Sequence, residues 1–170
     1  MAAGRENFCS SYLVNAILAA ACPRTAQSFG TRNQFLAEAR RIRELEARED
    51  SLTTIQGLLV STITYNMNSM DEIGFSYIVQ AISMGDRMKI FNTYPSTMDD
   101  KSKVSRGLTA WGAFHFQALF SFRFFRPPLI KSRSKFPLLD PRDNPLEFRS
   151  LINNIGGYAF PGRYETIGQY

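Results

Sequence analysis

The residues best suited to metal binding or nucleophilic chemistry are few, namely Cys9, Cys22 and His115. A structural zinc site needs about four cysteine or histidine ligands, usually in close pairs, and this chain has no such pair. His115 lacks a nucleophile or carboxylate at a spacing typical of a catalytic set, so we expect a half-buried helix residue. We expect both cysteines to be small packing residues.

The glycine-rich motifs that bind phosphates or activate a serine are also missing. The sequence contains no G-x-G-x-x-G, no G-x-x-x-x-G-K and no G-x-S-x-G. We therefore predict no catalytic residues, no bound cofactor and no metal within this chain. An enzyme is the class that the residues support least.

The positive charge lies in the last third of the chain. Lys and Arg number 20 against 15 Asp and Glu, and residues 101–170 carry +7 while residues 1–100 carry −2. A candidate basic patch interleaved with phenylalanines consists of Arg123, Arg126, Lys131, Arg133 and Lys135. One hypothesis is a site for single-stranded nucleic acid. The hypothesis we favour is that the phenylalanines pack, the charges face water and Arg126 bonds the helix-terminal carbonyls.

Hydrophobic spacing predicts helices over residues 7–22, 31–47, 51–65, 73–88 and 101–124. Asp50 or Ser51 is expected to cap the third helix, and Asp99 and Asp100 are expected to cap the fifth. Proline ends the first helix, and Pro127-Pro128 ends the last. Residues 131–145 are expected to be extended, and a short sixth helix is expected over 146–155. The predicted fold is all-α, an irregular array of about five or six helices with an extended C-terminal tail.

Each predicted helix has an apolar stripe that should face the core. The expected buried residues are, helix by helix, Phe8, Tyr12, Ala16, Ile17 and Ala20; Phe35, Ala39, Ile42 and Leu45; Leu52, Ile55, Leu58, Leu59 and Ile63; Phe75, Ile78, Val79 and Ile82; and Val104, Leu108, Trp111, Leu119 and Phe122.

Two apolar stretches are candidates for a membrane or export segment. Residues 111–122 are shorter than the roughly 20 residues that a spanning helix needs. Residues 12–22 have the length of a signal-peptide core, but Asn15 interrupts them and the preceding charges balance. We favour a buried helix there. We therefore expect no membrane partner and a reducing, intracellular compartment.

Three segments, in this order, resemble one family. They are FCSSYLVNAILAAACP at residues 8–23, EDSLTTIQGLLVSTITYNMN at 49–68 and RGLTAWGAFHFQALFSFRFFRPPLI at 106–130. Together they resemble the regulatory "middle homology" domain of fungal binuclear-zinc-cluster transcription factors, of the nitrate-assimilation or xylanolytic-activator type. The resemblance covers residues 8–138. It implies a partial regulatory domain at 1–138 and a divergent tail at 139–170.

The resemblance rests on particular positions and has clear departures. The matching positions, expected to be structural, are Asn15, Ser51, Leu52, Thr53, Gln56, Trp111, Phe114, Arg126, Pro127 and Pro128. Gln117-Ala118 stands where the family commonly has Asp-Arg, and Phe125 stands where a glycine is common. The run MKIF at residues 88–91 also replaces the Leu-Gly-Leu-His type of run that usually ends the fourth helix in that family.

The resemblance implies a non-enzymatic regulator of transcription in the nucleus. Its partners would be the transcription machinery or a regulatory protein, with a small-molecule effector. Zinc and DNA would be bound only by a cysteine cluster that this sequence lacks, so the chain is interpreted as a fragment or a truncated gene product. Two alternatives stay open, a stand-alone helical protein that binds a small molecule and a truncated product without independent function.

Overall fold

The structure is a computed structural model that describes residues 9–23, 25–45, 50–92, 94, 96–131 and 136. The chain divides into two compact units, Met1–Pro137 and Leu138–Tyr170, and every described residue lies in the first. The described helices are α1 (Ser11–Ala21), α2 (Ala26–Leu45), α3 (Leu52–Met67), α4 (Asp71–Arg87) and α5 (Asp100–Phe124). The described residues contain no strand, which confirms the predicted all-α class. The expected helix over 146–155 lies outside these residues.

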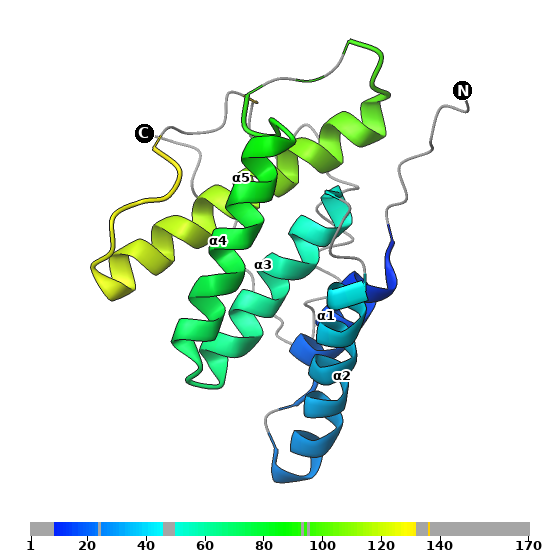
Figure 1. Cartoon of the computed structure of the whole chain (residues 1–170), viewed down its shortest axis with the longest axis vertical. Coiled ribbons are helices and arrows are strands. Elements are labelled where there is room, and N and C mark those ends of the chain that lie inside the picture. The colour runs from blue at the N-terminus through cyan, green and yellow to red at the C-terminus, as the bar shows by residue number, and fades with distance from the viewer. Residues whose placement is uncertain are drawn as a thin grey trace, which may run out of the picture. The chain divides into compact units, whose positions relative to one another are not determined.

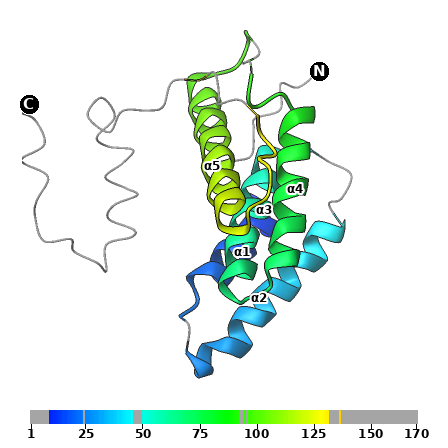
Figure 2. The same cartoon turned by 90° about the vertical axis from the view of Figure 1, so that its left-hand side faces the viewer.

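The helices pack around α3. Helices α1 and α4 each pack along α3, α2 packs along α1, and α5 crosses α3 and α4 (Figures 1 and 2). Ser51 caps α3 and Asp99 caps α5, as predicted, and Ser10 forms a further cap at the start of α1 that was not predicted. The side chains of Ser10, Ser51 and Asp99 each accept a hydrogen bond from the backbone N–H three residues on, at 3.1 Å in every case.

Several helix boundaries differ from the prediction. Helix α1 begins at Ser11, four residues late, and α4 begins at Asp71, two residues early. Helix α2 begins at Ala26, five residues early, because Thr25 starts the turn: its hydroxyl accepts from the N–H of Ser28 at 3.3 Å. Helix α3 continues to Met67, and the turn that follows is tight because Ser69 adopts a left-handed conformation with φ of 59°.

Tyr12 is the residue that docks α1 onto α3. Its side chain is fully buried, and its hydroxyl is hydrogen-bonded to the Ser61 hydroxyl at 3.2 Å. Burial raises the pKa of Tyr12 to about 12. The ring lies so close to Gly57 that a Cβ at this position would be 2.5 Å from a ring carbon. A glycine is therefore required where the two helices approach.

The predicted buried stripe of α5 is largely wrong. Leu108, Leu119 and Phe122 are 40%, 67% and 83% exposed, and Trp111 is half-buried. The buried face of α5 instead consists of Ser102, Arg106, Gly107, Thr109, Ala110, Ala113, Gln117 and Phe120. The small side chains on this face let α5 cross its neighbours closely. The buried polar side chains, such as Thr109 and Gln117, form hydrogen bonds, although a hydrophobic pattern assigns polar residues to the surface.

Three smaller errors concern the first two helices. Ile17 is 47% exposed, Ala20 is exposed and Leu45 is 72% exposed. The face of α1 that meets its neighbours is centred on Tyr12, Ala16 and Ala19, so Ile17 and Ala20 fall to one side. Leu45 is the last residue of α2. Of the other expected core residues, Phe8 lies outside the described part of the chain.

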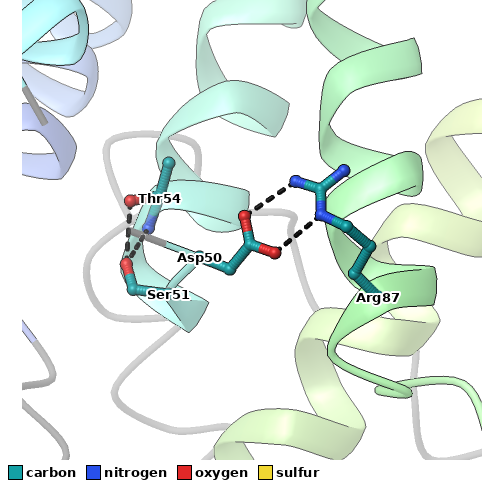
Figure 3. A network of polar contacts seen from close by, with 4 residues as sticks. All are labelled: Asp50, Ser51, Thr54 and Arg87. Atoms are coloured by element: carbon teal, nitrogen blue, oxygen red, sulfur yellow. Dashed lines mark hydrogen bonds and ion pairs between the residues drawn. The ribbon is translucent and has the colours of Figure 1, made fainter. Parts of the chain in front are cut away.

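An exposed ion pair joins the start of α3 to the end of α4. Both guanidinium contacts from Arg87 to the Asp50 carboxylate are 2.7 Å, and Asp50 directly precedes the cap formed by Ser51 (Figure 3). The hydrogen bonds from Arg87 hold the pKa of Asp50 below its ordinary value.

We expect Arg87→Gln to lower the free energy of unfolding only slightly at neutral pH, as for other solvent-exposed pairs. Because the folded-state pKa of Asp50 is lowered, this contribution exists above the unfolded pKa near ~3.9 and is lost as the pH falls through the folded value. A double-mutant cycle with Asp50→Asn, measured by urea denaturation at neutral and acidic pH, tests this. A coupling energy that persists in acid would contradict it.

Candidate functional site

The matched residues on α1 and α3 lie at helix starts and helix contacts. Asn15 is half-buried and donates to the backbone carbonyl of Ser11 at 2.9 Å. Ser51 caps α3, and Leu52 and Thr53 directly after it are buried. These side chains hold the local backbone and do not converge on a common point.

The matched residues Gln56, Trp111 and Phe114 connect α3 and α5 to their surroundings. The amide of Gln56 donates to the Thr109 hydroxyl at 2.8 Å, which links α3 to α5. The indole N–H of Trp111 donates to the carbonyl of Phe136 at 3.0 Å, and the ring meets Phe114 edge to face at 5.8 Å. The indole therefore holds the backbone of residue 136 against α5.

The Arg126-Pro127-Pro128 segment follows the end of α5, as predicted. The helix ends at Phe124, and Phe125 adopts a left-handed conformation with φ of 52°. The N–H of Arg126 donates to the carbonyl of Ser121 at 3.0 Å. Phe125 thus occupies a conformation that favours glycine, which is the residue the family commonly has here.

Gln117 holds the chain that returns after the two prolines. Its side chain is 2% exposed, and its carbonyl oxygen accepts from the N–H groups of Leu129 at 2.9 Å and Ile130 at 3.4 Å. At the position where the resembled family commonly has an aspartate, this chain thus has a neutral amide that accepts hydrogen bonds from the backbone.

We expect Gln117→Ala to lower the free energy of unfolding by about 1–3 kcal/mol, because it leaves two amides without their acceptor. Hydrogen exchange should accelerate at the amides of Leu129 and Ile130. Gln117→Glu keeps the acceptor and should retain slow exchange there. Unchanged exchange at both amides in Gln117→Ala would show that another group holds this segment.

Arg126 bonds a helix-terminal carbonyl, as predicted, but through its backbone N–H and not its side chain. The guanidinium instead pairs with Glu72 at the start of α4, at 2.7 Å. It also lies over the ring of Phe75, 4.1 Å from the centroid. Arg126 therefore joins α5 to α4, and an acidic neighbour distant in sequence neutralises it.

The structure describes two of the other four residues of the candidate basic patch. Arg123 and Lys131 are exposed, whereas Arg133 and Lys135 lie outside the described residues. The expectation that the interleaved phenylalanines pack holds for some and fails for others. Phe124 packs on Phe120 at 4.4 Å, but Phe122 is 83% exposed and Phe125 is 94% exposed.

Cys9, Cys22 and His115 do not come together. Cys9 is exposed rather than packed and Cys22 is half-buried, so the packing prediction was wrong for Cys9. His115 is exposed rather than half-buried, because it lies on the outer face of α5. Among the described residues, no three metal-ligating side chains of His, Cys, Asp or Glu lie together.

No helix in the described ranges combines the length and hydropathy needed to cross a bilayer.

A groove lies between the C-terminal halves of α3 and α5, with a volume of about 420 Å³. We call it the α3/α5 groove. Its lining residues are Thr62, Ile63, Asn66, Met67, Ser69, Phe116, Leu119, Phe120, Arg123 and Phe124. Arg123 is the single charged residue in this lining, and it forms no ion pair within the described part of the chain.

The sequence pattern did not predict this groove. Leu119 and Phe122 were expected in the core because they recur at helical spacing on α5. An apolar stripe that faces a binding partner has the same spacing as one that faces the core. The spacing of Leu119 and Phe122 therefore did not distinguish a core face from a binding surface. The absence of any acidic residue over 101–131 was the second signal.

The described residues thus form an all-α unit with a surface groove whose lining mixes apolar and polar side chains. The chain is related to a fungal transcription factor. It is 29% identical over 177 residues to the nitrogen assimilation transcription factor nit-4 of Neurospora crassa, a match that covers 95% of this chain and 16% of that protein. The chain therefore spans about a sixth of the length of the curated relative. No family model matches it, and no solved structure matches it.

Proposed function

We propose that this chain is a non-enzymatic regulatory segment of a fungal transcription factor that acts in the nucleus. The observation that carries the proposal is the similarity to a nitrogen assimilation transcription factor over 95% of the chain. This match favours the nitrate-assimilation type over the xylanolytic-activator type. The matched middle-domain segments and the all-α fold are consistent with the same assignment.

The proposed mechanism is conformational. The helical unit holds or releases the segments that bind DNA and activate transcription, in response to a partner or a metabolite. Such a switch needs two states that the effector binds unequally. Helix α5 is the element best suited to move, because its inner face consists mainly of small and polar side chains beside Phe120, and Leu108, Leu119 and Phe122 are exposed. In this proposal, zinc and DNA are bound by a cysteine cluster outside the present sequence.

A second candidate function is a helical protein that binds a small molecule on its own. It is favoured by the volume of the α3/α5 groove, about 420 Å³, which lies within the usual range of ligand sites. Thermal unfolding of the chain in a screen of nitrogen metabolites and organic anions separates the two. A ligand that raises the melting temperature without any effect on transcription would favour this candidate.

A tethering experiment in yeast tests the proposal. The chain is inserted between a heterologous DNA-binding domain and an activation segment, and reporter output is compared with that of a fusion protein in which a flexible linker of equal length takes its place. We expect the chain to change the output by about tenfold, the size of a coupling of ~1.4 kcal/mol. Equal output from the two fusion proteins, with equal protein levels in the nucleus, would overturn the proposal.

A further inference from the structure

We propose that the α3/α5 groove binds an acidic amphipathic helix of a protein partner. Recognition of this kind places apolar residues at positions i, i+3, i+4 and i+7 of a helix into an apolar groove. The groove supplies aromatic and aliphatic surface from both sides, with Ile63 and Met67 from α3 and with Phe116, Leu119 and Phe120 from α5. This inference goes beyond the proposed role in transcription and does not depend on it.

The extent of the apolar surface favours a helix over a small molecule. On one rim Met67 is 50% exposed, and on the other Leu119 is 67% exposed. A ligand confined to the space between the two rims would leave Met67 and Leu119 largely in water, whereas a helix about 10 Å wide can cover both rims. Clustered large apolar side chains at a surface mark an interaction site.

The charges around the groove determine which kind of helix fits. Arg123 is the charged residue of the groove lining, the half of α5 that lines the groove contains no acidic residue, and α3 contains no charged residue. Glu72 is already paired with Arg126. Arg123 in the groove lining is thus available to a carboxylate. Complementary charge selects an acidic partner and rejects a basic one.

The same charges argue against a second copy of this chain as the occupant. A two-fold interface brings the same patch of both copies together. The Arg123 side chains of two copies would then approach each other across a surface that contains no acidic residue from α3 or α5 after Asp100. Like charges placed opposite each other are unfavourable.

Fluorescence anisotropy with two synthetic peptides and the full chain tests this inference. The first is a labelled helical peptide of about 18 residues with leucines on one face and glutamates beside them, and the second has lysine in place of every glutamate. We expect the acidic peptide to bind with an affinity that falls as salt rises, and the basic peptide not to bind.

Two variants of exposed groove residues and two matched controls locate the site. Leu119→Ser and Arg123→Glu should each weaken binding of the acidic peptide by about tenfold or more. Lys101→Glu makes the same charge change at the other end of α5, and Phe29→Ser removes a 55% exposed ring from α2, so both should bind as the unchanged chain does. Circular dichroism confirms that each variant is folded.

Four results would overturn the inference. The first is equal binding of both peptides, which would mean that charge does not select the partner. The second is an equal loss of affinity in Lys101→Glu and Arg123→Glu. The third is no binding of either peptide to the folded chain. The fourth is a dimer in analytical ultracentrifugation that Leu119→Ser converts to a monomer, because the face would then be an interface between copies. None of these results bears on the tethered reporter, so this inference and the proposed function can fail separately.

Discussion

Replacing Tyr12 by alanine is expected to lower the free energy of unfolding by about 3–5 kcal/mol, the range for removing a buried aromatic side chain. The ring is fully buried between α1 and α3, and it belongs to the same core cluster as Ile55 and Leu58. The loss would be a large part of the roughly 5–15 kcal/mol that stabilises a typical domain. Urea denaturation followed by far-UV circular dichroism measures it.

Tyr12→Phe is the matched control. It keeps the ring and removes only the hydrogen bond to Ser61, so a loss of about 0.5–1.5 kcal/mol is expected. If Tyr12→Ala and Tyr12→Phe had similar stabilities, the ring could not be the contact that docks α1 onto α3.

The second large effect is expected at Gly57. Alanine is intrinsically better than glycine in a helix by about 1 kcal/mol, yet we expect Gly57→Ala to lower the free energy of unfolding by about 1–3 kcal/mol. The new methyl group would lie 2.5 Å from a carbon of the Tyr12 ring, which is buried and has little room to move.

The same substitution on α2 provides the control. A Cβ at Gly30 would meet nothing within 4 Å, so Gly30→Ala should raise the free energy of unfolding by up to about 1 kcal/mol. Opposite signs for the two glycines are the expected result, measured by the same denaturation. Stabilisation by Gly57→Ala would mean that α1 and α3 do not approach closely at this point.

The double variant makes the test specific to one contact. When Tyr12 is already alanine, the added methyl group at residue 57 no longer meets a ring. Gly57→Ala should then be neutral or stabilising, so that the two changes are strongly non-additive. Additive effects would indicate that Gly57 matters for a reason unrelated to Tyr12.

The helices themselves were predictable because their ends carry local signals. Ser51 and Asp99 cap α3 and α5, and Pro127-Pro128 follows, after two intervening residues, the end of α5 at Phe124. These signals depend on neighbouring residues alone, so one sequence suffices to detect them. The early start of α2 was missed because Thr25 is a weaker cap signal than the hydrophobic spacing that begins later.

The orientation of α5 was not predictable in the same way. Gln117 and Thr109 are buried because particular backbone amides and the Gln56 side chain satisfy them, and those partners are distant in sequence. Leu119 and Phe122 are exposed although their types favour the core. Tertiary hydrogen bonds decide which face of α5 is inward, and hydrophobic spacing contains no information about them.

The candidate site was predictable only in part for the same reason. The excess of basic residues near the end of α5 was evident, but the pairing of Arg126 with Glu72 removes one of them from any binding role. Arg123 remains, and its position in the groove depends on how α5 crosses α3. The composition of a patch can thus be read from sequence, whereas its available charge depends on the fold.

The most direct test asks whether regulation depends on the packed helices. Reporter output from the tethered chain would be measured for the unchanged protein, Tyr12→Phe and Tyr12→Ala, at matched nuclear levels. We predict that Tyr12→Phe retains the effect on transcription and that Tyr12→Ala abolishes it, in step with their free energies of unfolding. Full retention of the effect in an unfolded Tyr12→Ala chain would contradict a regulatory function carried by this helical fold.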